Sequence, residues 1–135
     1  MIVKLRQESQ TAIEHSGKAV EDDVSVLDVQ QEYAVLFLTC DSEGACVYLD
    51  LGKPYAEGFN LRFFTITDAT LPPYWHIGFT PTQRHGRTDF AVLLGPHFWA
   101  NDVFWYERLL DNDEVARREY ADYLRAVGSR SVSHS

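Results

Sequence analysis

The side chains best suited to chemistry gather in residues 71–106, which hold all three tryptophans and three of the five histidines. These histidines, His76, His85 and His97, are separated by 9 and 12 residues, and no HExxH, HxH or CxxC pattern accompanies them. The spacing therefore predicts no metal site and no cofactor. Ordinary surface or half-buried histidines are the favoured interpretation.

Motifs for covalent catalysis are missing from the sequence. It contains no GxSxG elbow, no glycine-rich phosphate loop and no zinc-deaminase signature. An acid–base pair assembled by the fold, His76 or His97 with Asp89 or Asp102, stays open as a hypothesis. Whether the chain is an enzyme is therefore undecided at this level, with the balance against it.

One cationic turn, Arg84-His85-Gly86-Arg87, interrupts an otherwise acidic chain. A glycine-containing turn flanked by arginines can bind a carboxylate or phosphate through backbone N–H groups and guanidinium groups. Hairpin tips are also polar simply because they meet water, and Asp89 is near enough to neutralise one arginine. The second interpretation is favoured, and the first is kept as a candidate anion site.

An aromatic block, Phe98-Trp99 and Phe104-Trp105-Tyr106, is the most unusual feature of the sequence. So many large rings cannot all point inward from one short segment, so we expect the core to take Phe98 and Phe104, with Trp105 as a further candidate. The remaining rings would lie in a cleft or on the surface and contribute to binding. The predicted binding residues are Trp75, Arg84, His85, Arg87, Trp99, Trp105 and Tyr106.

The two cysteines, Cys40 and Cys46, flank a tight turn. A three-residue loop with a bulge would place them opposite each other, at a separation that suits a disulfide. A four-residue loop would instead place Cys40 opposite Ala45. In a cytosolic chain both thiols would stay reduced in either case, which is the favoured interpretation.

Five strands are predicted, over residues 33–39, 46–51, 59–67, 74–80 and 88–94, the first two as a hairpin. The connections are too short for crossover helices, so the sheet should be an antiparallel meander. The last two strands each show one alternating apolar face, formed by Trp75, Ile77 and Phe79 and by Phe90, Val92 and Leu94.

Two helices follow the predicted sheet. Residues 103–110 can be capped by Asn101 or Asp102, and residues 114–127 by Asn112 or Asp113, with Gly128 as the C-terminal stop. The second helix carries an apolar stripe of Ala116, Tyr120, Tyr123, Leu124 and Val127. The predicted fold class is α+β, an antiparallel meander of five or six strands with the C-terminal helices packed on one face.

The N-terminal segment is less clearly patterned. Residues 1–15 have a loose helical spacing that could end at Gly17, and a short strand at Ile2–Leu5 is the competing prediction. Residues 18–32 would supply an acidic loop and a short strand. Length predicts a single domain over residues 1–127 and a flexible polar tail over residues 128–135.

Charge is distributed unevenly around a net value of −8. Residues 1–60 carry eleven acidic and four basic side chains, whereas residues 61–135 carry nine acidic side chains and eight arginines. An acidic chain without a basic stripe disfavours nucleic acid as a partner and would attract a basic protein, although acidity can also serve solubility alone. No membrane span or signal peptide is recognisable, so we expect a cytoplasmic protein.

Three functional hypotheses follow. The first is a small acidic protein-binding module, an inhibitor comparable in size and charge to a bacterial immunity protein that neutralises a basic toxin or nuclease. The second is an enzyme or small-ligand binder with an aromatic-walled pocket, with His76, Arg84, His85 or His97 at its mouth. The third is a homo-oligomer whose aromatic block forms the subunit interface.

Overall fold

Two antiparallel sheets and a layer of helices make up the fold seen in the computed structural model, which describes residues 1–7, 24–84 and 86–132. Sheet A has the order β2-β1-β6 and contains β1 (Ile2–Leu5), β2 (Glu32–Ala34) and β6 (Phe64–Asp68). Sheet B has the order β5-β4-β3-β8-β7 and contains β3 (Phe37–Asp41), β4 (Gly44–Leu49), β5 (Glu57–Asn60), β7 (His76–Arg84) and β8 (Arg87–Gly95). Short 3₁₀ turns, η1 (Val24–Val26) and η2 (Leu61–Phe63), and the helices α2 (His97–Ala100), α3 (Trp105–Leu110) and α4 (Glu114–Val132) complete the described chain.

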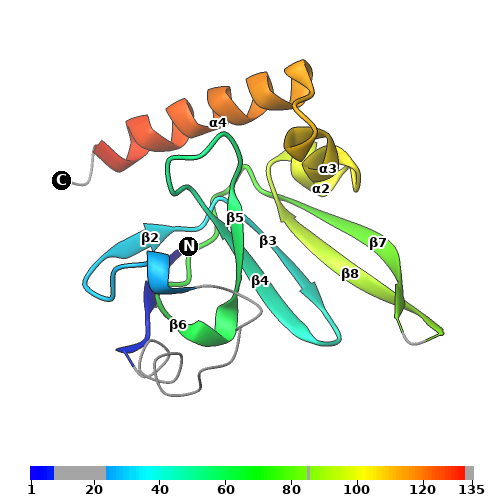
Figure 1. Ribbon diagram of the computed structural model, residues 1–135, viewed down its shortest axis with the longest axis horizontal. Coiled ribbons are helices and arrows are strands. Elements are labelled where there is room, and N and C mark those ends of the chain that lie inside the picture. The colour runs from blue at the N-terminus through cyan, green and yellow to red at the C-terminus, as the bar shows by residue number, and fades with distance from the viewer. Residues whose placement is uncertain (8–23, 85, 133–135) are drawn as a thin grey trace.

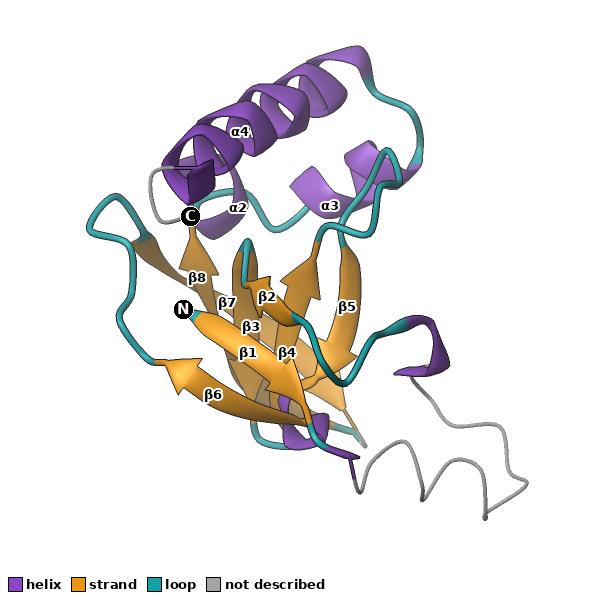
Figure 2. Ribbon diagram, turned by 90° about the vertical axis from the view of Figure 1, so that its left-hand side faces the viewer, coloured by secondary structure: helices purple, strands orange, loops and turns teal. Residues whose placement is uncertain are grey.

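The predicted α+β fold class is confirmed. Sheet B has five antiparallel strands, and the C-terminal helices pack on strands, as expected. Meander order holds from β3 to β5 and from β7 to β8, and the two groups join where β8 pairs with β3. Figure 2 shows sheet A lying in front of sheet B, with the helices gathered at one end of the strands.

Two predicted strands are divided between the sheets. The predicted strand over residues 33–39 breaks before Phe37, so that its first part is β2 in sheet A and its last part is β3 in sheet B. The predicted strand over residues 59–67 is interrupted by η2, where the Asn60 side chain accepts a hydrogen bond from the Arg62 N–H at 3.0 Å. This side-chain cap holds a turn that carries the chain from sheet B to sheet A.

At the N-terminus the competing strand prediction is confirmed. Residues Ile2–Leu5 form β1, which is the central strand of sheet A, so a helix at these residues is wrong. Here β1 pairs with β2 on one side and with β6 on the other. These strand pairs, and not the bonds of a helix, satisfy its backbone N–H and C=O groups, so tertiary pairing overrides local helix propensity. The rest of the predicted helix, and part of the predicted acidic loop, lie outside the described residues.

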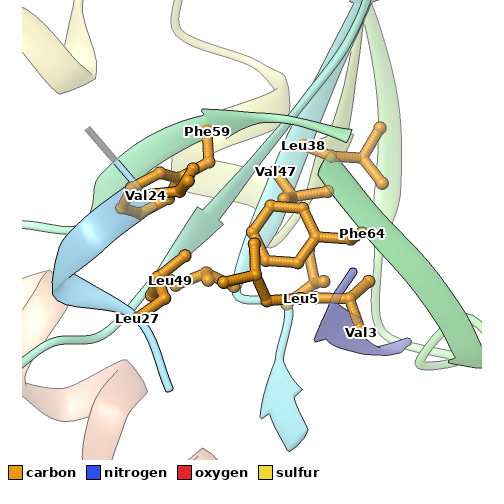
Figure 3. Packing of buried hydrophobic residues seen from close by; sticks show 10 residues of the cluster. Val3, Leu5, Val24, Leu27, Leu38, Val47, Leu49, Phe59 and Phe64 are labelled. Atoms are coloured by element: carbon orange, nitrogen blue, oxygen red, sulfur yellow. The ribbon is translucent and has the colours of Figure 1, made fainter. Parts of the chain in front are cut away.

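The first hydrophobic core fills the space between the two sheets (Figure 3). Sheet B contributes one alternating face of its strands, including Leu38, Val47 and Phe59, all of which are buried. Sheet A contributes Val3, Leu5 and Phe64, and the side chains from both sheets point toward one another in Figure 3. Residues one position along each strand of sheet B necessarily face the opposite side.

The second core lies between that opposite side of sheet B and the helices. Phe37 of β3 stacks on Trp99 of α2 with ring centroids 4.1 Å apart, and Trp105 meets Phe37 edge to face at 5.9 Å. The predicted stripe of α4 is confirmed in part, since Ala116, Tyr120 and Tyr123 are buried here, while Leu124 and Val127 pack against the cluster half-buried.

Close approach of α2 to the sheet depends on one glycine. A Cβ atom placed on Gly78 of β7 would lie 1.7 Å from the Ala100 carbonyl oxygen, far inside van der Waals contact. Only a residue without a side chain therefore allows α2 to lie this close to β7. Ala91 and Leu93, on the same side of the neighbouring strand β8, are buried as well.

The helix ends differ from the predictions at two points. Helix α3 begins at Trp105 and not at Val103, because Asp102 accepts a hydrogen bond from the Phe104 N–H at 3.1 Å in a turn before the helix. Helix α4 begins at Glu114 as predicted, with the Asp113 carboxylate accepting from the Ala116 N–H at 2.9 Å. The stop predicted at Gly128 is wrong, since α4 continues to Val132 and Gly128 is not among the positive-φ glycines.

No helix in the described part of the chain is both long and apolar enough to cross a membrane.

Candidate functional site

An exposed apolar strip runs along the outer face of the β7–β8 hairpin. It is formed by Ile77, Phe79 and Phe90, whose exposed fractions are 62%, 71% and 62%. Ile77 lies opposite Leu94, Phe79 opposite Val92, and Phe90 opposite Pro81 in the antiparallel register. Because side chains of paired residues point to the same face of a sheet, these three project from one surface.

The strip is uncovered because sheet A does not extend over it. Leu38 of β3 belongs to the core between the sheets, and Leu94, its partner on β8, still packs against that core. Beyond β8 lies β7, which is the edge strand of sheet B. In Figure 1 the hairpin extends away from the other strands, toward the lower right. Apolar side chains at this level of exposure on neighbouring strands are typical of interaction surfaces.

A pocket of about 290 Å³ lies on the opposite face of the same hairpin, at the margin of the helix layer. Its floor comes from sheet B and its walls from α2, α3 and the turn between them. The lining residues are Thr39, Asp41, Tyr48, Thr80, Ala91, Leu93, Trp99, Asp102, Val103, Tyr106 and Glu107. We call this the aromatic pocket.

Three rings of the aromatic pocket contact one another at steep angles. Tyr48 lies 4.8 Å from Trp99 and 5.2 Å from Tyr106 between ring centroids, and Trp99 and Tyr106 are 5.9 Å apart. The Trp99 indole N–H donates to the Leu38 carbonyl at 3.1 Å, and the Tyr106 hydroxyl donates to the Ala56 carbonyl at 2.6 Å. These bonds fix the rings in place.

Both tyrosine hydroxyls of the pocket are held in the neutral form. Burial raises the pKa of Tyr106 to about 12 and also raises the pKa of Tyr48 well above its ordinary value. A neutral ring presents its electron-rich face without a competing phenolate charge. The aromatic walls therefore keep the same chemical form throughout the physiological range of pH.

Three carboxylates also line the pocket. Asp41 accepts a hydrogen bond from the Glu43 N–H at 2.8 Å, and Asp102 forms an ion pair with Arg108, which lowers the pKa of the Asp102 carboxyl. Glu107 is exposed, and no ion pair of Glu107 occurs among the described residues. No described residue of the lining is basic, so the pocket combines aromatic faces with negative charge.

The predicted binding residues do not form one site. Trp99 and Tyr106 meet in the aromatic pocket. Trp105 is 1% exposed, so its ring has no surface on which a partner could pack. Trp75 is half-buried against the inter-sheet core, and its indole N–H points to the Tyr123 hydroxyl at 3.4 Å.

The cationic turn forms the tip of the β7–β8 hairpin. Arg84 and Arg87 are paired across its end, and Gly86 has a positive φ of 74°. His85 lies outside the described residues, and the candidate anion site at this tip stays a prediction. The positive φ at Gly86 is the backbone conformation that glycine adopts without strain.

The fold brings together two of the three histidines considered as candidate site residues. His76 at the start of β7 and His97 at the start of α2 have ring centroids 6.5 Å apart, and both are exposed. Neither lines the aromatic pocket. Within the described ranges no group of three or more His, Cys, Asp or Glu side chains is arranged to hold a metal ion.

The two cysteines are not bridged. Only Ser42 and Glu43 separate β3 from β4, so Cys40 lies opposite Ala45 and Cys46 opposite Thr39. The register places the two thiols on opposite faces of the sheet, which excludes the alternative with a disulfide and agrees with the favoured prediction of free thiols. Burial and the neighbouring Asp41 raise the pKa of the Cys40 thiol, which keeps it protonated and weakly reactive.

Phe104, which was expected in the core, is 60% exposed at the position before the start of α3. The apolar faces of β7 and β8 were recognised, but their exposure was not. The signal that could have revealed it is Gly78 between Ile77 and Phe79, since a glycine there marks the face that a helix approaches.

No protein-family model, no curated protein and no solved structure matches this chain.

Proposed function

We propose that this chain is a small acidic module that binds another, basic protein through the apolar strip on β7 and β8. The observation that carries the proposal is the exposure of Ile77, Phe79 and Phe90 side by side on one hairpin. Full burial of one such side chain is worth roughly 1.5–3 kcal/mol. A partner that buries these three side chains would therefore gain several kcal/mol of binding free energy.

Charge supports a basic partner. The net charge is −8, and most of the excess lies in residues 1–60, which carry eleven acidic and four basic side chains. Such a field accelerates encounter with a cationic protein and opposes binding to phosphate backbones. Association should therefore slow as salt screens the charges, whereas the apolar contact should persist.

The narrower form of the proposal is an inhibitor that covers a basic toxin or nuclease, in the manner of an immunity protein. Its supports are small size, acidity and a docking surface on a projecting hairpin. This form places the chain in the cytoplasm, where Cys40 and Cys46 would stay reduced.

A second candidate, a small-ligand binder, is favoured by the aromatic pocket. At about 290 Å³ it lies at the lower limit of ligand pockets, and its described polar lining consists of carboxylates and threonines. The histidines expected at its mouth, His76 and His97, are not part of it. Binding of a neutral metabolite to the chain, with no protein partner, would favour this candidate.

The test is capture of proteins from the native host with this chain as bait, at low and at high salt. The proposal predicts one stoichiometric basic partner, identified by mass spectrometry, whose association slows as salt rises. Capture with the Ile77→Ser variant should fail. Val115→Ser is the matched control, since Val115 is 61% exposed on α4, away from the strip. Equal capture by both variants would contradict the assigned surface.

A further inference from the structure

The aromatic pocket faces away from the apolar strip, on the other side of the same hairpin. Thr80 and Ala91 are paired across β7 and β8 and line the pocket, whereas their neighbours Phe79 and Phe90 belong to the strip. We infer that this pocket is a separate binding site for an organic cation, the guanidinium or ammonium group at the end of an arginine or lysine side chain. The inference rests on the proposed function, because the basic partner docked on the strip would supply that side chain from a segment that passes around the edge strand β7.

The dimensions of the pocket fit one side chain. Ligand pockets for drug-sized molecules span roughly 300–1,000 Å³, and this pocket measures about 290 Å³. This volume is sufficient for one alkyl chain with a charged end group, entering between the sheet and α3.

The walls have the chemistry that a cation requires. Tyr48, Trp99 and Tyr106 contact one another at interplanar angles of 60–84°. Trp99 is 5% exposed and stacks on Phe37, so the half-buried rings of Tyr48 and Tyr106 supply the aromatic surface that a cation would contact. A cation within about 6 Å of an aromatic face is attracted by the ring quadrupole. Rings of this kind also cover the apolar stem of an arginine or lysine.

The carboxylates of the lining add the opposite charge. Asp102 pairs with Arg108 of this chain, which offsets the charge of that carboxylate. Glu107 is exposed one residue after Tyr106 and adds a negative charge at the mouth. No described residue of the lining is basic, and the Arg108 guanidinium beside it is paired with Asp102.

A metal ion is the less suitable cation. The described residues include no group of three or more metal-binding side chains, and Asp41 and Asp102 already accept backbone hydrogen bonds. Hard metal ions take six or more oxygen ligands, which three separate carboxylates and aromatic walls do not supply. An organic cation needs only charge and a flat apolar surface.

The test is a nuclear magnetic resonance titration of the whole chain with n-butylguanidinium, against n-butylurea as the neutral isostere. The inference predicts saturable shifts at the backbone amides of Thr80, Ala91 and Tyr106 with the cation alone. Glu107→Gln should weaken binding by roughly two- to fivefold, the range of one exposed charge pair. Glu32→Gln removes the same charge from β2 in sheet A and should leave the affinity unchanged.

A second pair of probes identifies the source of the cation. A capped tripeptide with a central arginine should bind at least as well as n-butylguanidinium, and the same peptide with citrulline should not bind. Binding of the free cation without binding of the arginine peptide would overturn the side-chain source. Equal shifts with the urea and the guanidinium, or no shifts at the three amides, would overturn the cation site.

Failure of this inference is distinguishable from failure of the proposed function. The titration needs no partner protein and reports on the pocket face of the hairpin, whereas capture reports on the strip face. A chain that binds its partner through Ile77 but gives no guanidinium shifts would retain the first proposal and lose the second.

Discussion

Two tyrosine hydroxyls on α4 meet opposite surroundings although both rings are buried. The Tyr123 hydroxyl donates to the Leu36 carbonyl at 2.6 Å and receives the Trp75 indole N–H at 3.4 Å. The Tyr120 hydroxyl, one turn earlier, has no hydrogen-bond partner among the described residues, and burial raises its pKa. The same atom thus stabilises the fold at one position and opposes it at the other.

Replacing each tyrosine by phenylalanine separates these two effects. Tyr123→Phe should lower the free energy of unfolding by about 1–3 kcal/mol, because it leaves the Leu36 carbonyl unsatisfied in the core. Tyr120→Phe should leave stability unchanged or raise it, because it removes a buried group without a partner. Urea unfolding of the two variants measures both values. A larger loss for Tyr120→Phe than for Tyr123→Phe would contradict the assignment.

Raised phenol pKa values predict a loss of stability in alkali. The pKa of Tyr106 is about 12, above the ordinary value near 10, because burial disfavours the phenolate. The contribution of the neutral Tyr106 phenol to the free energy of unfolding is complete below about pH 10, where this phenol is also neutral in the unfolded chain. That contribution is lost as the pH rises toward 12. Unfolding free energies across this range should fall less steeply for Tyr106→Phe than for the unchanged chain. Identical slopes would show that Tyr106 ionises normally in the folded state.

At the scale of elements, the position of α2 depends on backbone contact with β7. A Cβ atom on Gly78 would meet the Ala100 carbonyl oxygen at 1.7 Å, and neither backbone can move without separating α2 from the sheet. Gly128 is the contrasting glycine, since it lies within α4 and nothing is within 4 Å of the position of its Cβ.

The alanine variants of these glycines should shift stability in opposite directions. Gly78→Ala should destabilise the chain by about 3 kcal/mol or more, at the upper end of the cost of overpacking. Gly128→Ala should stabilise it by up to about 1 kcal/mol, because alanine favours helix more than glycine does. Thermal or urea unfolding measures both. A Gly78→Ala variant of normal stability would refute the close packing of α2 on β7.

Local sequence patterns predicted where strands and helices lie better than they predicted which strands pair with each other. Alternation identified the β3–β4 and β7–β8 strands, and helical spacing identified the buried stripe of α4, because each pattern is set by neighbouring residues. The division of residues 59–67 between two sheets was not predictable in this way, since it depends on the Asn60 cap and on distant pairing with β1. Pairing with Ile2–Leu5 likewise overrode the helical spacing at the N-terminus.

The candidate sites were only partly predictable for the same reason. Trp99 and Tyr106 were two of the seven predicted binding residues, chosen for their rings, and both line the aromatic pocket. Asp41 and Tyr48 were not connected with them, because β3 and β4 lie more than forty residues earlier in the chain. Periodicity also cannot say which face of β7 a second layer covers, and so the exposure of Phe79 was missed.

For the whole molecule, the two cores and the strip follow from one arrangement. Sheet B is covered by sheet A on one face and by the helices on the other, but sheet A is narrower and stops short of β7. Ile77, Phe79 and Phe90 lie on the part of sheet B that sheet A leaves uncovered, so they form an exposed apolar strip on an acidic chain. Self-association through this strip is the competing outcome, and a sedimentation experiment on the chain alone would reveal it.

The most direct test of the account is the affinity of a captured partner for two variants of matched exposure. Ile77 on the strip is 62% exposed and Val115 on α4 is 61% exposed, so replacing either by serine removes a similar apolar surface. The account predicts that calorimetric titration gives at least about a tenfold loss of affinity for Ile77→Ser, as expected for an interface contact worth more than 1 kcal/mol. Val115→Ser should bind as the unchanged chain does. Equal affinities for the two variants would contradict the assignment of the β7–β8 strip as the docking surface.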